Sequence, residues 1–187
     1  NITINDARIS SIPKTIEKMA NLLELRLLGN ELRTLPKQIG GLKSLERLNI
    51  IKNCLEVLPT AIGNLKNLKI LKLWNNNLTN LPSEIEGLSS LEIFDVSQNK
   101  LNSLTNCVGK LDSLKQLNLW SNHLTTLPDS IIQLERLEEL TLSHNSMEEI
   151  PSLVFKLTNL KKIGLRGLNL TDVPLEIVNL NKLVRLD

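Results

Sequence analysis

Eight leucines of this 187-residue chain recur at a constant spacing of 23 residues, with no insertion or deletion between them. A fixed period of this length indicates a structure built by stacking one small unit repeatedly. One packing unit used many times also suits the composition, because aromatic residues make up only 2% of the chain and Leu, Ile and Val must fill the core. The leucines are Leu22, Leu45, Leu68, Leu91, Leu114, Leu137, Leu160 and Leu183.

Counted from each of these leucines as position 1, the unit reads LxxLxLxxNxLxxLPxxIxxLxx. Seven full units occupy residues 22–182, residues 1–21 fit the tail of an earlier unit, and residues 183–187 open another. We therefore expect residues 1–187 to form a single repeat domain. Stacked repeats need polar caps over their end faces. Since both chain ends cut through a unit, we expect a fragment of a longer chain.

Each unit predicts one strand and one short helical turn. Positions 4 and 6 are apolar and their neighbours are variable, as at Leu48 and Ile50, which is typical of a half-buried strand. Strands repeated every 23 residues all run the same way, so the sheet is parallel with rungs about 4.8 Å apart. The apolar positions 18 and 21, such as Ile39 and Leu42, favour a 3₁₀ turn or short helix, and the Pro at position 15 suits the corner before it.

Position 9 is asparagine in six consecutive units. A short amide side chain can turn the chain after a strand and bond backbone groups that would otherwise be buried without partners. We predict that these residues stack into a ladder of hydrogen bonds between coils. They are Asn30, Asn53, Asn76, Asn99, Asn122 and Asn145.

Two units depart from the pattern. The fourth has Thr105 in place of the proline and Val108 in place of the usual isoleucine. The seventh has Leu168 in the asparagine position, between Gly164 and Gly167. Because a leucine side chain cannot bond the backbone of the turn, we predict a looser or reshaped coil there. This departure is either drift near the end of an array or a contact with a partner.

The unit closely resembles the short leucine-rich repeats, in the 23-residue LPxxIxxL variety. Repeats of this variety are found in Ras-group scaffold proteins, in repeat domains attached to some GTPases and kinases, and in some bacterial exported proteins. The resemblance covers essentially the whole chain. It implies an α/β solenoid, right-handed and curved, with a parallel β-sheet on the concave side and 3₁₀ or short helices on the convex side.

The concave face of the sheet is the candidate protein-binding surface, because positions 3, 5, 7 and 8 should point away from the core. Both tryptophans occupy position 7, and Trp is enriched where interfaces gain most of their affinity. We expect a contiguous or nearly contiguous apolar strip made by Leu28, Ile51, Ile70, Trp74, Ile93 and Trp120. The polar candidates beside it are Arg47, Lys72, Asp95, Gln116 and His144. The alternatives are that scattered apolar residues are ordinary surface, or that the position-7 side chains shield the sheet.

Other kinds of site have little support. With 22 Lys and Arg against 20 Asp and Glu, and no run of like charge beyond two residues, we expect no nucleic-acid surface. No apolar stretch is long enough for membrane insertion. His123 and His144 lack a third metal ligand of recognisable spacing, and Cys54 and Cys107 occupy different positions of the unit, so neither a metal site nor a disulfide is expected. No catalytic or cofactor motif occurs, and the sequons at Asn77 and Asn169 arise from the repeat itself.

The sequence therefore predicts a monomeric protein-interaction module or scaffold that is not an enzyme and carries no cofactor. The family resemblance implies a cytoplasmic signalling partner, such as a small GTPase or a phosphatase. Two alternatives stay open. One is an exported, secreted or cell-surface bacterial repeat protein that binds host or matrix proteins. The other is the regulatory or substrate-binding part of a larger enzyme.

Overall fold

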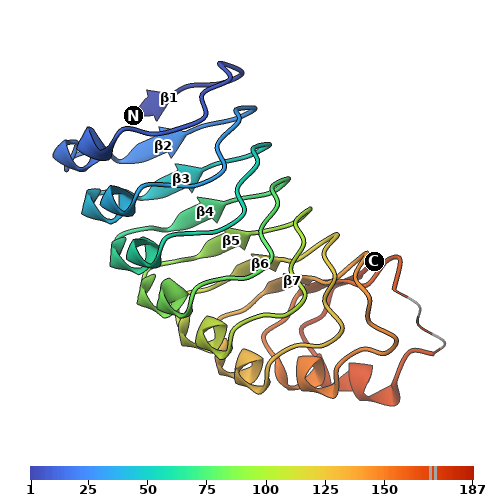
Figure 1. Ribbon diagram of the computed structural model, residues 1–187. Helices are drawn as coiled ribbons and strands as arrows, with labels where there is room; N and C mark the ends of the chain where they lie inside the picture. Colours follow the sequence, from blue (N-terminus) through green and yellow to red (C-terminus); the bar gives the residue numbers. More distant parts are fainter. Residues whose placement is uncertain (169, 171) are drawn as a thin grey trace.

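The computed structural model describes residues 1–168, 170 and 172–187, so the sequon at Asn169 lies outside the described residues. Within them, nine strands form one parallel, open sheet whose order follows the chain from β1 to β9 (Figure 1). The strands are β1 (Ile2–Thr3), β2 (Glu24–Arg26), β3 (Arg47–Asn49), β4 (Ile70–Lys72), β5 (Ile93–Asp95), β6 (Gln116–Asn118), β7 (Glu139–Thr141), β8 (Lys162–Gly164) and β9 (Arg185–Leu186).

A five-residue 3₁₀ helix lies between each strand and the next along the chain, and these helices follow the outer arc of the curved stack (Figure 1). The predicted 3₁₀ turn at positions 18 and 21 is thus confirmed. The helices are η1 (Lys14–Lys18), η2 (Lys37–Gly41), η3 (Thr60–Asn64), η4 (Ser83–Gly87), η5 (Asn106–Lys110), η6 (Asp129–Gln133), η7 (Ser152–Lys156) and η8 (Leu175–Asn179).

The corner before each helix is set by the residue at position 15. Pro36 has φ −66° and ψ 146°, and Thr105, which replaces proline in the fourth unit, has φ −66° and ψ 145°. The Thr105 hydroxyl also accepts a hydrogen bond from the backbone N–H of Cys107 at 3.3 Å. The exceptional threonine therefore keeps the corner geometry, and the departure at this position leaves the coil intact.

The register between strands equals the sequence period throughout. Leu71 of β4 lies beside Phe94 of β5, and both are fully buried, as are the leucines that define position 1 from Leu45 to Leu160. Each coil buries its apolar side chains only against the coils before and after it. Stability is consequently close to a sum of coil terms and nearest-neighbour terms.

The predicted asparagine ladder is confirmed, and Asn99 shows its geometry. Its Nδ2 donates to the carbonyls of Leu73, Val96 and Ser97 at 3.0, 3.1 and 3.0 Å, and its Oδ1 accepts from the N–H of Leu78 at 2.9 Å. One buried side chain thus satisfies backbone groups in two coils. Equivalent bonds between coils are made by Asn30, Asn53, Asn76, Asn122 and Asn145.

The turn after each central strand contains a left-handed residue at position 8, which the sequence reasoning did not anticipate. The backbone φ is between 49° and 68° at Gly29, Lys52, Asn75, Gln98, Ser121, His144 and Gly167. Only glycine adopts this region without steric cost, and other residues lose about 1–3 kcal/mol there. The two glycines at position 8, Gly29 and Gly167, were the sequence feature that could have indicated this left-handed conformation.

The ladder ends at the seventh coil, as the leucine at position 168 predicts. Leu168 is half-buried, and its N–H donates to the Leu165 carbonyl at 3.4 Å. The N–H of Met147, which an asparagine at 168 would match, finds no acceptor among the described residues. Strand β8 and helix η8 nevertheless keep their places in the stack, whereas Val173, at a position that is buried in the earlier coils, is 55% exposed.

Candidate functional site

The candidate residues at position 3 lie side by side across the sheet. The register joins Arg47 to Ile70, Ile70 to Ile93, and Ile93 to Gln116. Position 5 forms a second row, in which Lys72 pairs with Asp95. Both rows belong to the face opposite the buried position-4 residues, as strand alternation requires.

The structure corrects the expectation that every residue at positions 3, 5, 7 and 8 faces the concave side freely. Glu24, Ser97 and Ser143 are buried, with relative exposures of 6%, 4% and 6%. Each has a polar partner that accounts for the burial. The Ser97 hydroxyl donates to Asp95 at 2.6 Å, and the Ser143 hydroxyl accepts from the backbone N–H of Arg166 at 3.0 Å.

The expected apolar strip is divided rather than contiguous, because the polar row at position 5 runs between positions 3 and 7. One apolar row consists of Ile70 and Ile93. The other, at position 7, is interrupted by Ser97 between Trp74 and Trp120. All six predicted apolar residues are half-buried, so each exposes only part of its side chain on the concave face. They are Leu28, Ile51, Ile70, Trp74, Ile93 and Trp120.

Each indole is held by a position-8 side chain from a neighbouring coil. The Lys52 ammonium lies 5.5 Å from the centroid of the Trp74 ring, a cation–π arrangement. The His144 ring meets Trp120 edge-on, with centroids 6.0 Å apart and planes at 81°. His144 was a predicted site residue, whereas Lys52 was missed. Lys52 reaches the indole of the following coil, whereas His144 reaches that of the preceding coil.

At the N-terminal end of the sheet, Arg47 forms an ion pair with Glu24. Its Nε lies 3.3 Å from Glu24 Oε1, and Arg26 Nε lies 2.6 Å from the same oxygen. The hydrogen bond from Arg26 is the main cause that lowers the pKa of Glu24, with burial opposing it and Arg47 adding to it. The predicted binding residue Arg47 therefore pairs with a buried carboxylate, while its own side chain stays 36% exposed.

Two hollows open on the concave face. The central one, of about 170 Å³, brings together four predicted residues, which are Lys72, Ile93, Asp95 and Gln116. The second, of about 770 Å³, lies over β7, β8 and β9 and includes Trp120 and His144 from the predicted set. Sequence reasoning singled out Gly164 at this place but did not predict a hollow there. The missing side chain at position 164 was the signal.

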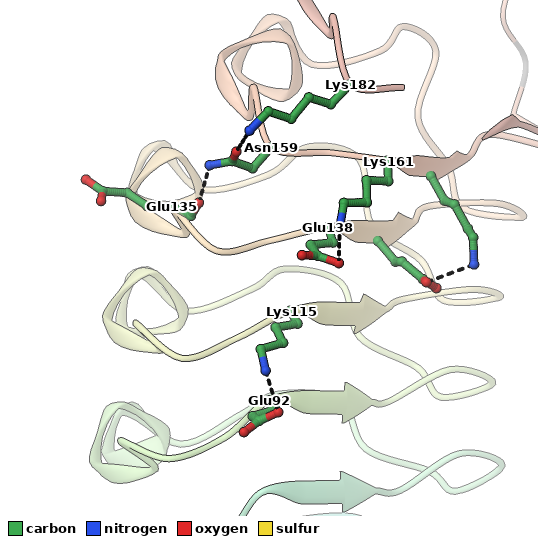
Figure 2. A network of polar contacts seen from close by, with 9 residues as sticks. Glu92, Lys115, Glu135, Glu138, Asn159, Lys161 and Lys182 are labelled. Atoms are coloured by element: carbon green, nitrogen blue, oxygen red, sulfur yellow. Dashed lines mark hydrogen bonds and ion pairs between the residues drawn. The ribbon is translucent and has the colours of Figure 1, made fainter. Parts of the chain in front are cut away.

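Ion pairs tie coils together at position 2, beside the start of each strand. Glu92 and Lys115 lie 2.8 Å apart, and Glu138 and Lys161 lie 2.9 Å apart (Figure 2). The hydrogen bond from each lysine lowers the pKa of its glutamate. Asn159 accepts from Lys182 at 2.6 Å in the same network. Exposed pairs of this kind contribute little to stability because water screens them, so this edge is structural support.

Other kinds of site receive no support from the described part of the chain. It contains no group of three or more His, Cys, Asp or Glu residues arranged to hold a metal ion. Both Cys54 and Cys107 are free thiols in it. None of its helices has the length and apolar character needed to cross a bilayer.

Comparison with known proteins fits the coil geometry. Residues 60–140 match the leucine-rich repeat region family, and residues 112–170 match the leucine rich repeat family. A solved leucine-rich-repeat protein of Leptospira interrogans is 36% identical to this chain, covers 99% of it and has a TM-score of 0.81. This chain belongs to the leucine-rich-repeat family. It spans 53% of the Leptospira protein, and a search of curated proteins gives no match.

Plant receptors are also similar to this leucine-rich-repeat chain. A TDR receptor is 32% identical over 98% of the chain and 32% of its own length, with a TM-score of 0.84. The ectodomain of the membrane receptor kinase GASSHO1/SCHENGEN3 from Arabidopsis thaliana, solved in complex with Casparian strip integrity factor 2, is 30% identical. That match covers 95% of this chain and 25% of the receptor, with a TM-score of 0.74. Leucine-rich-repeat domains are commonly non-catalytic protein-binding modules.

Proposed function

We propose that this domain, acting as a monomer, binds an extended segment of a protein partner across its concave face. The observation that carries the proposal is the pair of indoles, Trp74 and Trp120, held on the open side of a parallel sheet. A parallel sheet is normally covered on both faces, and here the second face is free of other elements. An extended segment fits because the face is long and narrow.

The fixed indoles favour binding energetically. Lys52 and His144 restrict the two rings before a partner arrives, so little side-chain entropy remains to be lost on association. Between the apolar rows, Lys72 and Asp95 offer charges of both signs to a partner's polar groups. The occupant is therefore a segment that alternates apolar and polar side chains.

The resemblance to Ras-group scaffold repeats supports a cytoplasmic signalling partner of the small-GTPase or phosphatase type. A second candidate is a bacterial cell-surface or secreted protein that binds host or matrix proteins. The 36% identity to a Leptospira protein over 99% of this chain favours that second candidate. The two differ in the partner and share the concave face.

The test compares a Trp74→Ala, Trp120→Ala double variant with a matched control, Val57→Ala, Ile132→Ala. The control residues are exposed apolar side chains outside the concave columns. Proteins captured from lysates or matrix extracts are identified, purified and titrated against each variant by calorimetry. Thermal unfolding first establishes that both variants are folded.

We expect the tryptophan variant to bind an identified partner at least about 30-fold more weakly, since one tryptophan at the centre of an interface often contributes about 2 kcal/mol or more by itself. The control should bind within about twofold of the wild-type protein. Equal affinity for all three proteins would remove the concave face from consideration and direct the search to the convex side.

A further inference from the structure

The larger hollow has Gly164 in its lining, where the seventh coil carries no side chain. A Cβ at Gly164 would lie 3.0 Å from Thr141 Cγ2 and 3.1 Å from Ser143 Oγ, so any side chain there would fill the floor of the hollow. Gly167 has φ 68°, and a Cβ on it would collide with the His144 imidazole. Gly164 thus keeps the hollow open, and Gly167 leaves room for the His144 ring that packs on Trp120.

The charged side chains that line this hollow are unequal in number. They comprise three cations and two carboxylates. Lys162 pairs with Glu139 at 2.9 Å, and Arg185 pairs with Asp187 at 2.7 Å. The remaining cation, Arg166, forms no ion pair with any carboxylate in the described part of the chain. Its guanidinium is exposed, and its backbone N–H is fixed by the Ser143 hydroxyl at 3.0 Å.

We propose that this hollow takes an acidic side chain of the bound segment, with its carboxylate on the Arg166 guanidinium and its aliphatic stem against Trp120. A guanidinium presents paired donors that match a carboxylate. The volume of about 770 Å³ has room for the acidic residue and its immediate neighbours. This inference rests on the proposed function and adds to it the chemistry and the direction of the partner.

The direction follows from a contrast with the central hollow. The charged residues that line the central hollow are Lys72, Asp95 and Glu139. They include both signs, with no excess of positive charge. An acidic residue therefore gains most at the β8 end, and the segment's apolar residues lie toward Trp74. The bound segment should carry its acidic residue at a fixed distance from an apolar one.

The experiment uses random nine-residue peptides displayed on phage, fused at their C termini so that only side chains supply carboxylates. Selection is run on the whole 187-residue domain, on Arg166→Gln, and on the control Lys100→Gln. Lys100 is an exposed cation at position 10, away from the hollow. Selected peptides are then synthesised with amidated C termini, as Asp or Glu forms and as the matching Asn or Gln forms.

We expect wild type and Lys100→Gln to enrich Asp or Glu at one offset from an apolar residue, and Arg166→Gln to lose that preference while keeping the apolar one. In calorimetry, amidating the acidic side chain should weaken binding to wild type about 10- to 100-fold and to Arg166→Gln less than about threefold. Peptides that bind without an acidic preference, or a preference unchanged in Arg166→Gln, would overturn this inference alone. If no peptide is enriched, or if binding survives the double tryptophan variant, the proposed function fails with it.

Discussion

The fourth coil, residues 91–113, and the seventh, residues 160–182, share a sequence period but differ in how the turn after the strand is bonded. In the fourth, Asn99 is buried and bonds backbone groups of two coils. In the seventh, Leu168 makes no such bonds, and glycines replace two side chains of the concave face. The fourth coil has a tightly bonded turn, whereas the seventh has open space on the face where a partner would bind.

The difference shows that the period and the ladder are separable. Strand β8 stays in register with β7 although the asparagine is gone, because the apolar side chains at positions 1, 4 and 6 still pack, as at Leu160 and Ile163. Apolar packing therefore sets where a coil lies, and the ladder sets how firmly its turn is held. Four experiments separate these contributions.

The largest effect should come from truncating one core position in the middle and at the end of the stack. Leu71→Ala leaves a cavity at a fully buried site and should lower the free energy of unfolding by about 2–5 kcal/mol. Leu186→Ala removes the equivalent side chain at position 4 of β9, which is 47% exposed, and should cost less than about 1 kcal/mol. Urea denaturation followed by circular dichroism measures both, and equal losses would contradict the nearest-neighbour description.

The position-9 residues of the two coils can be exchanged by mutation. Asn99→Leu copies the seventh coil and leaves buried backbone groups without partners, so it should cost about 2–4 kcal/mol. The reverse change, Leu168→Asn, offers an acceptor to the Met147 N–H and should stabilise the protein by about 0.5–1.5 kcal/mol. Hydrogen exchange at Met147 checks the mechanism, because a stabilised variant without slower exchange at that amide would need another explanation.

A smaller effect distinguishes two ion pairs at position 3. The pKa of Glu24 is lowered in the folded protein, so its charge stabilises the fold above the unfolded value of about 4.3 and this contribution is lost as pH falls through the folded value. We expect Glu24→Gln to be less stable than wild type at pH 7, with the difference shrinking below about pH 4. The exposed pair at the other end supplies the control, Glu139→Gln, which should change stability little at either pH.

The smallest effect is expected at the corner of the fourth coil. Thr105 already has the dihedral angles of the prolines, so Thr105→Pro should fit without strain and restrict the unfolded chain. The loss of the hydroxyl bond to Cys107 offsets part of that gain. The melting temperature should change by no more than a few degrees, in contrast to a large drop if the threonine side chain were essential to the corner.

The sequence alone predicted the parts of the fold that depend on periodic burial. The strands, the 3₁₀ turns and the asparagine ladder all follow from what position 4, 9 or 18 must do in every coil. Features that depend on one neighbour were missed or wrong. The burial of Ser97 depends on its bond to Asp95, and the contact of Lys52 with Trp74 depends on where one long side chain lies. The hollow could be predicted only by considering the missing side chain of Gly164 together with Arg166.

The sequential strand order has a mechanical consequence. Because β1 bonds only β2, and each later strand bonds only its two neighbours, tension between the chain ends would load the coils in series. The stack would then extend in steps and not break at once, with each coil that opens releasing 23 residues. A fully stretched segment of that length measures about 80 Å. Among the seven full coils, we expect the one without its asparagine to open at the lowest force, because its turn lacks the ladder bonds.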